Sequence, residues 1–184
     1  MTVKADEYAD LRTMQFKPSV IEIKSHHVFE HFSYVESLAI LAKWTLALAD
    51  KGTIVLGVPD VGRLGKALQH LSAPKTAAVI RLLYGSQNDP WAYHINGWTQ
   101  NLLQFVLELF GYRIVSTTAH GNAKDDFPNC WICCTAKKTQ NLSKSELTQC
   151  SISFLKNYVV LPQQKKLYDL LCAQLEAKFE GWVC

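Results

Sequence analysis

The sequence predicts an α/β fold in which a helix joins two parallel strands and further helices flank the sheet. Residues 19–24 (SVIEIK) alternate apolar and polar side chains and are rich in β-branched residues, which is typical of a strand. Residues 34–52 repeat apolar side chains at steps of three and four, which is typical of a helix. Residues 53–59 (TIVLGVP) are almost continuously apolar, as in a buried parallel strand. This order of elements is that of a βαβ unit.

The composition fits a globular protein of one domain, or one domain with a small appendage. The chain has 184 residues, of which 48% are hydrophobic and 19% charged, so it can bury a sizeable core. Its net charge of +3 comes from scattered side chains, and we therefore expect no nucleic-acid partner. No run approaches the roughly 18 apolar residues of a membrane span, and the first 16 residues lack the apolar region of a signal peptide. We expect a cytoplasmic protein without a membrane partner.

Six cysteines are present, and we interpret them as reduced thiols. Cys130, Cys133 and Cys134 have the spacing of half a zinc site, but the sequence contains no second Cys-x-x-Cys pair to complete it. The stretch that carries them is apolar and predicts a strand, in which cysteine behaves as a small hydrophobic residue. We therefore expect no metal there.

The boundaries of the first unit follow from capping and turn residues. Lys17 and Pro18 mark a turn before the first strand. Ser33, with Glu36 three residues later, predicts a capping box at the start of the helix, and Gly52 predicts its end. The apolar run 53–59 predicts cover by helices on both faces of the sheet.

The rest of the chain predicts alternating helices and strands with one long loop. Helical pieces are expected over residues 61–72 and 74–84, and a further helix from its Thr99 cap to Gly111. Residues 112–118 and 130–138 predict two strands that form an antiparallel pair. A polar linker is expected over 141–150, and the tail 151–182 predicts two helical segments broken near Pro162.

His27-Val28-Phe29-Glu30-His31 matches the H-x-x-E-H pattern of one group of zinc peptidases. Such a site needs both histidines on one face of a helix and a third ligand, for which His94 and Glu108 are the candidates. This segment instead follows a strand directly, and the capped helix begins only after it. The alternative is that Glu30 and His31 fix the loop and the next helix by hydrogen bonds.

Three motifs, in order, resemble the class I S-adenosylmethionine (SAM)-dependent methyltransferases. The run 9–32, ending in Ser-His-His-Val-Phe-Glu-His, resembles the family's segment through its fourth strand. The stretch "LALADKGTIVLGVPD" resembles its helix, turn and fifth strand, and "HINGWTQNLLQFVLELFGYRIV" its last helix and sixth strand. The resemblance implies a partial Rossmann-like sheet of the family's strands four to seven, with the last pair antiparallel. It predicts an α/β domain over residues 1–140 and a helical extension packed on it over 141–184.

The resemblance also implies a cofactor, SAM, and places residues around it. The predicted cofactor contacts are Asp10, Leu11, Ser25, His26, His27 and Glu30. The candidate catalytic bases are His27, His31 and His94, because histidine titrates near neutral pH. The predicted acceptor pocket is formed by Pro59, Asp60, Tyr84, Trp91, Tyr93, His94 and Trp98. The aromatic residues of this loop either line a lid or only pack the loop onto the domain. No metal ligand is predicted.

The family's glycine-rich cofactor loop, D-x-G-x-G-x-G, is missing, since the first glycine is Gly52. We therefore expect the strand at 19–24 to lie at an open edge, completed by an upstream extension, a partner strand or a second copy. The predicted function is methyl transfer to an unknown acceptor, incomplete or inactive in this chain alone. The alternative is a non-catalytic interaction subunit, and a remote alternative is a zinc hydrolase.

Overall fold

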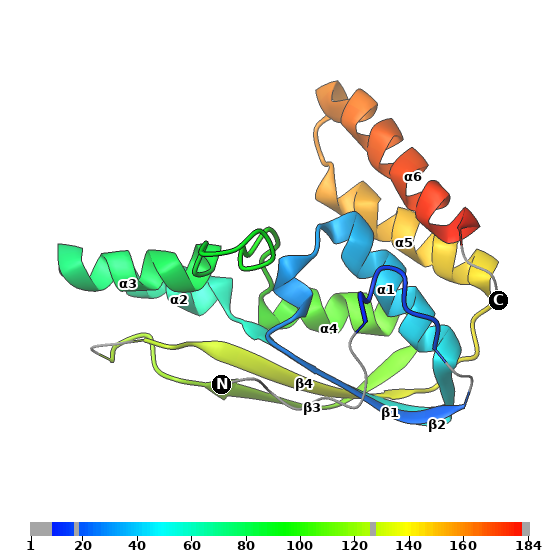
Figure 1. Cartoon of the computed structure of the whole chain (residues 1–184), viewed down its shortest axis with the longest axis horizontal. Coiled ribbons are helices and arrows are strands. Elements are labelled where there is room, and N and C mark those ends of the chain that lie inside the picture. Colours follow the sequence, from blue (N-terminus) through cyan, green and yellow to red (C-terminus); the bar gives the residue numbers. More distant parts are fainter. Residues whose placement is uncertain (1–8, 17–18, 126–127, 182–184) are drawn as a thin grey trace.

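The computed structural model describes residues 9–16, 19–125 and 128–181, and within them it confirms the α/β fold. Four strands form one sheet in the order β1-β2-β4-β3 (Figure 1). They are β1 (Val20–His26), β2 (Leu48–Pro59), β3 (Tyr112–His120) and β4 (Trp131–Lys138). The turn predicted at Lys17 and Pro18 lies outside the described residues, as does residue 182 at the end of the predicted tail.

The predicted βαβ unit is confirmed. Helix α1 (Tyr34–Ala47) begins at the Ser33–Glu36 capping box and connects β1 to β2, which lie parallel. Since both strands run the same way, their carboxyl ends reach the same edge of the sheet, where His26 lies opposite Gly57. In open α/β sheets, this edge is where ligands bind.

The end of α1 differs from the prediction. The helix stops at Ala47, and residues 48–52 already belong to β2, so Gly52 does not end the helix. The left-handed residue is Lys51, with φ 59°, and the pairing with β1 is irregular there. The physical reason is tertiary: the Lys138 ammonium donates to the carbonyls of Thr45 and Leu48, the kind of orphan acceptors that a glycine cap would otherwise satisfy.

The predicted antiparallel pair is confirmed, and the sequence did not show where β4 would lie. β4 pairs antiparallel with β3 and also with β2, so it is inserted between them. Its side chains alternate, with Ile132, Cys134, Ala136 and Lys138 buried. Cys134 accordingly occupies the core as a small apolar side chain.

Helices α1 and α4 (Gln100–Leu109) lie on one face of the sheet, and α5 (Lys144–Tyr158) and α6 (Lys165–Glu180) lie beyond α1 (Figure 1). The predicted cover by helices on both faces is therefore wrong for the described part of the chain. On the other face of β2, the His26 ring lies over Gly57 so closely that a Cβ added there would be 2.3 Å from its Nδ1 atom. The His26 side chain thus covers part of the face of β2 that a second layer of helices would otherwise cover.

The carboxyl-terminal region also departs in part from the prediction. Residues 141–150 are not a linker, because α5 begins at Lys144 behind its N-cap, Ser143. The break near Pro162 is confirmed as the short 3-10 helix η2 (Pro162–Gln164). α5 and α6 contribute Leu147, Phe154, Leu155, Leu175 and Phe179 to the same apolar core as the sheet.

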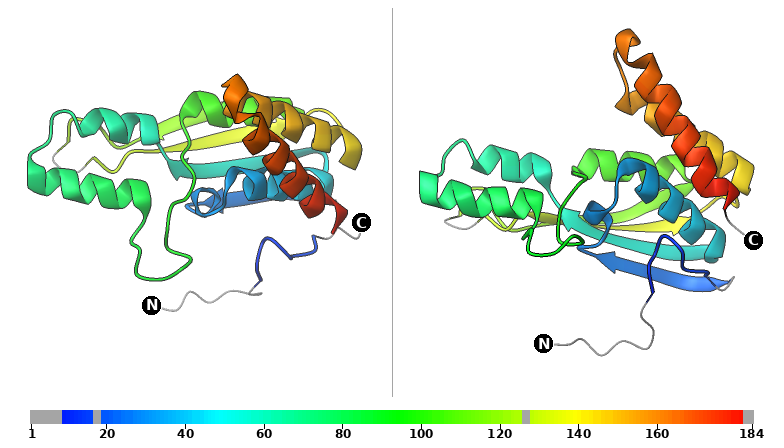
Figure 2. Two further views of the ribbon diagram at one scale, coloured as in Figure 1. Left: turned by 90° about the horizontal axis from the view of Figure 1, so that it is seen from above. Right: turned by 45° about the horizontal axis from the view of Figure 1, so that its top comes forward.

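Helices α2 (Val61–Ala67) and α3 (Ala73–Tyr84) extend past the carboxyl ends of β1 and β2 (Figure 2). The loop from Gly85 to Trp98 returns the chain from α3 to α4 beside this edge (Figure 2). None of the helices in the described ranges is both long and apolar enough to cross a bilayer.

Candidate functional site

The segment after β1 is held by one buried aromatic side chain. His27 turns the chain with a left-handed backbone, φ 53°, into the 3-10 helix η1 (Phe29–His31). Phe29 is buried and stacks between Trp44 and Trp98, with ring centroids 5.8 and 5.1 Å away. This anchoring places Glu30 in the interior, where its residue is only 1% exposed.

The pentapeptide of the peptidase pattern therefore does not form one continuous α-helix. His27 lies in the turn, whereas Glu30 and His31 lie in η1. His27 Nδ1 is 3.4 Å from Glu30 Oε1, and its side chain is half exposed. The interaction with this carboxylate raises the pKa of His27, and burial opposes the rise. The contact is that of an ion pair without hydrogen-bond geometry, since neither Glu30 oxygen has a hydrogen-bond partner in the described part of the chain.

His94 reaches the same carboxylate from the loop. Its Nε2 atom is 3.9 Å from Glu30 Oε1, and its ring lies against that of His31, with centroids 4.8 Å apart. Burial lowers the pKa of His94, while the Glu30 carboxylate opposes this shift. The structure thus gathers all three predicted bases, His27, His31 and His94, around Glu30.

The sequence did not indicate that Trp131 and His120 form an aromatic pair next to His27. Trp131, the first residue of β4, stacks on His120 with ring centroids 3.8 Å apart. The rings of His26 and His27 lie 6.2 and 5.7 Å from it. The available signal was an aromatic residue opening a strand, but only the insertion of β4 beside β2 brings it to this edge.

Some of the residues predicted to line the acceptor pocket are buried, and others are exposed on the loop. Asp60 is buried and caps α2, where its Oδ1 atom accepts hydrogen bonds from the amides of Gly62 and Arg63. Trp98 is fully buried and packs in the core, so it cannot line an open pocket. Pro59 pairs with Trp131 at the sheet edge.

The loop aromatics Tyr84, Trp91 and Tyr93 are exposed, Trp91 at 72%. These three side chains therefore do not pack the loop onto the domain. The loop is held instead by backbone hydrogen bonds to Glu30 and by the rings of His31 and His94, which contact backbone carbonyls.

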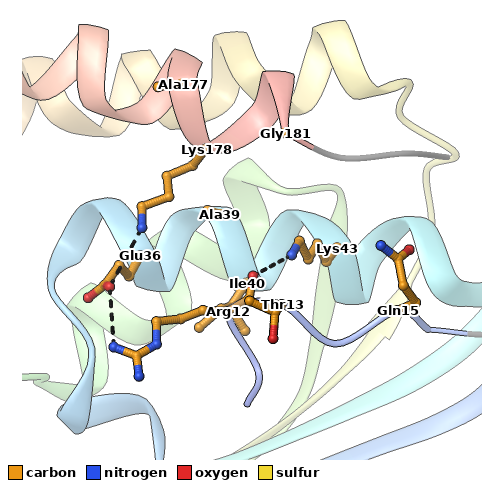
Figure 3. A pocket seen from close by; sticks show the side chains of 10 residues that line it. All are labelled: Arg12, Thr13, Gln15, Glu36, Ala39, Ile40, Lys43, Ala177, Lys178 and Gly181. Carbon is orange, nitrogen blue, oxygen red and sulfur yellow. Dashed lines mark hydrogen bonds and ion pairs between the residues drawn. The ribbon is translucent and has the colours of Figure 1, made fainter. Parts of the chain in front are cut away.

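Asp10 and Leu11 directly precede Arg12 and Thr13, which line a cleft of about 290 Å³ together with residues of α1 and α6 (Figure 3). Arg12 donates to both carboxylate oxygens of Asp10, and these hydrogen bonds lower the pKa of Asp10. The cleft is lined by Arg12, Thr13, Gln15, Glu36, Ala39, Ile40, Lys43, Ala177, Lys178 and Gly181. None of these residues comes from the predicted cofactor wall at Ser25 to Glu30, so this cleft does not join the two predicted cofactor segments.

No protein-family model matches the chain, and no curated protein matches it. Several solved structures match part of the chain. A SAM-dependent methyltransferase of Methanosarcina mazei matches at 11% identity, with a TM-score of 0.49, over 71% of this chain and 65% of its own. The 1,6-didemethyltoxoflavin-N1-methyltransferase of Burkholderia thailandensis, solved with S-adenosylhomocysteine, matches at 11% identity, with a TM-score of 0.45, over 72% of this chain and 49% of its own.

The strand directions and the antiparallel last pair are those that the motifs predicted. The fold is α/β. This chain spans less than two thirds of the length of either matched structure, and the similarity concerns the fold alone.

Proposed function

We propose that this chain forms the acceptor side of a SAM-dependent methyltransferase-like site and transfers a methyl group only when a further segment completes that site. The observation that supports this function is the gathering of His27, His31 and His94 around Glu30 at the carboxyl ends of β1 and β2. In this kind of sheet, that edge holds the reacting end of a bound cofactor.

In methyl transfer the main task of the protein is to align the acceptor atom with the methyl group. An acceptor atom attacks the methyl group of the sulfonium, and a base is needed only where that atom must lose a proton. His27 is the candidate base, because its side chain is half exposed whereas those of His94 and Glu30 are largely buried. The rings of Trp131 and His120 beside it offer a flat apolar wall for an acceptor.

The missing part is the nucleotide side of the cofactor site. The sequence has no glycine-rich loop, and β1 pairs only with β2 among the described strands. Ile21 in β1 is 79% exposed. A strand supplied by another polypeptide can add to this edge and bring the missing loop with it, whereas a second copy of this chain can supply a strand but not the loop.

The test is binding of SAM to the chain alone. The full chain is irradiated with radiolabelled SAM at millimolar concentration, and the labelled peptide is sequenced. We expect weak labelling within residues 25–30, reduced in His26→Ala and unchanged in His70→Ala, where the histidine is exposed in the turn after α2. Equal labelling of all three proteins, or none, contradicts the proposal for this chain.

A second candidate is an interaction subunit without catalysis, and one surface favours it. Helices α5 and α6 form a hairpin (Figure 1). Five apolar side chains are exposed in the end of α5, the connection and the first part of α6: Tyr158, Val160, Leu161, Leu167 and Leu170. Light scattering after size-exclusion chromatography, over a hundredfold range of concentration, tests self-association. If this surface makes the contact, Leu161→Asp gives a monomer, whereas the matched control Leu46→Asp, on exposed apolar surface of α1, does not.

A further inference from the structure

Glu30, His31 and His94 bring three metal-ligating atoms together beside the loop that carries His94. One ligating atom of each side chain lies within 4.8 Å of those of the other two. The amides of Ile95 and Asn96 donate hydrogen bonds of 3.0 and 3.1 Å to the Glu30 carbonyl. The backbone therefore fixes the loop against η1 without help from the three ligating groups.

Both histidine rings are oriented by backbone carbonyls. His31 Nδ1 lies 2.9 Å from the carbonyl of Tyr93, and His94 Nδ1 lies 3.0 Å from that of Leu82. A carbonyl oxygen can only accept a hydrogen bond, so Nδ1 carries the proton in each ring. The Nε2 atom of each neutral ring then presents a lone pair, and this is how metal-ligating histidines are usually oriented.

The buried Glu30 carboxylate accepts no hydrogen bond in the described part of the chain, and its nearest charge partner is the half-exposed His27, 3.4 Å from Oε1. Glu30 itself is 1% exposed. The atom of His94 that faces it at 3.9 Å is Nε2, the nitrogen with the lone pair. Two electron-rich atoms thus face each other in the interior, an arrangement that is unfavourable unless a cation lies between them.

We propose that Glu30, His31 and His94 bind a divalent transition-metal ion, for which zinc is the best fit. Two imidazoles and one carboxylate form a known ligand set of catalytic zinc sites, which leaves a fourth position for water or a substrate atom. Imidazole ligands favour such ions over Mg²⁺ and Ca²⁺, which prefer oxygen. Ligands about 2 Å from a tetrahedral ion are roughly 3.3 Å apart, so the three groups need only close slightly around it.

This ligand set is not that of the peptidase pattern. The pattern would use His27, whereas the geometry replaces it with His94 from the loop. His27 contacts Glu30 at 3.4 Å, but it is not one of the three residues whose ligating atoms gather within 4.8 Å, and its ring lies near Trp131. The proposal concerns metal binding alone and does not depend on methyl transfer.

The test uses the full chain, stripped with a chelator and titrated without cofactor. Zn²⁺ binding is measured by calorimetry, and Co²⁺ binding by its visible absorption, which reports a tetrahedral site. We expect one ion per chain. His31→Ala and His94→Ala should each weaken binding by at least roughly tenfold. The matched control His70→Ala should leave it within about threefold, because His70 touches none of the three ligands. His27→Ala should weaken binding less than His94→Ala does, because His27 contacts only the Glu30 ligand.

Glu30→Gln distinguishes a ligand from a structural residue. Since it removes a buried charge that accepts no hydrogen bond and whose nearest charge partner is the half-exposed His27, the stripped variant should melt at the same temperature as the stripped wild type or higher, and Zn²⁺ should no longer raise that temperature. The proposal is overturned if the wild type binds neither Zn²⁺ nor Co²⁺ stoichiometrically, or if it responds to Mg²⁺ alone. It is equally overturned if His27→Ala abolishes binding while His94→Ala retains it, or if stripped Glu30→Gln is less stable than stripped wild type. Failure of SAM labelling would leave all of these readouts unchanged.

Discussion

The side-chain ammonium of Lys138 donates a hydrogen bond of 2.8 Å to the carbonyl of Leu48, the residue at which α1 ends and β2 begins. The same ammonium donates a bond of 2.7 Å to the carbonyl of Thr45 in the last turn of α1. Lys138 is buried at the end of β4, and desolvation lowers its pKa. One side chain thus ties the last strand of the sheet to the helix–strand junction of the βαβ unit.

We expect Lys138→Met to destabilise the protein by about 1–3 kcal/mol, because it leaves two buried carbonyls without a donor. Denaturant unfolding measures this change. The matched control is Lys137→Met, which is next in the strand and points to the other face of the sheet. Equal effects of the two substitutions would show that the ammonium does not hold the junction.

Two glycines should respond oppositely to alanine. Gly111, between α4 and β3, has φ 83°, and an added Cβ would lie 2.9 Å from the Cβ of Gln140. Gly65 lies inside α2 with nothing within 4 Å of an added Cβ. Gly111→Ala should therefore cost about 1–2 kcal/mol or more of stability, whereas Gly65→Ala should gain about 0.5–1 kcal/mol. Thermal unfolding of both variants checks the signs, and a neutral Gly111→Ala would contradict the left-handed turn.

The start of α5 can be tested at its cap. The Ser143 hydroxyl accepts a hydrogen bond from the backbone in the first turn of the helix. Ser143→Ala should cost about 1 kcal/mol and lower the melting temperature by about 2–4 °C. Ser153→Ala, at an exposed position within the same helix, serves as control and should not lower it. If Ser143→Ala has no effect, residues 141–150 behave as the linker that the sequence suggested.

Tyr34 provides a prediction for alkaline pH. Its hydroxyl donates to the Gly97 carbonyl at 2.8 Å, and burial raises the pKa of Tyr34 to about 12. Because the pKa in the folded state is above the ordinary value of about 10, the stabilising contribution of the neutral phenol is complete below pH 10 and is lost as the pH rises toward about 12. The stability difference between wild type and Tyr34→Phe should shrink over that window.

Spectrophotometric titration checks the same group directly. The tyrosinate absorbance of wild type minus that of Tyr34→Phe should develop late in the folded protein. In denaturant, the same difference should appear near the ordinary value of about 10. Identical curves in both conditions would show that Tyr34 is not shielded.

Local sequence patterns predicted most elements correctly. The Ser33 and Thr99 caps, the stop at Gly111 and the break at Pro162 all depend on backbone chemistry within a few residues, and the structure confirms them. The helix expected over residues 61–72 ends earlier, at Ala67. The incorrect predictions at Gly52 and at residues 141–150 have different causes. The first was shifted by a contact with Lys138, far along the chain. The second was hidden because the first turn of α5 is polar and mostly exposed.

The candidate site was predictable only in part. The sequence showed that His27, Glu30 and His31 follow a strand, and it nominated His94 by its motif. It could not show that Glu30 is buried without a donor, or that the rings of His31 and His94 turn their Nε2 atoms away from the carbonyls that hold them. The sequence also could not show that Trp131 lies at the carboxyl end of β2, beside His27.

The sequence alone determined the kinds of elements, their order along the chain and the absence of a glycine-rich loop, because these depend on neighbouring residues and on composition. Tertiary structure alone decided which distant residues meet: β4 lies between β2 and β3, Lys138 closes the α1–β2 junction, and His94 joins Glu30 and His31 in one group of ligating atoms. The physical reason is that periodicity and capping act over a few residues, whereas strand insertion, burial of charge and ring orientation follow from contacts between segments many residues apart.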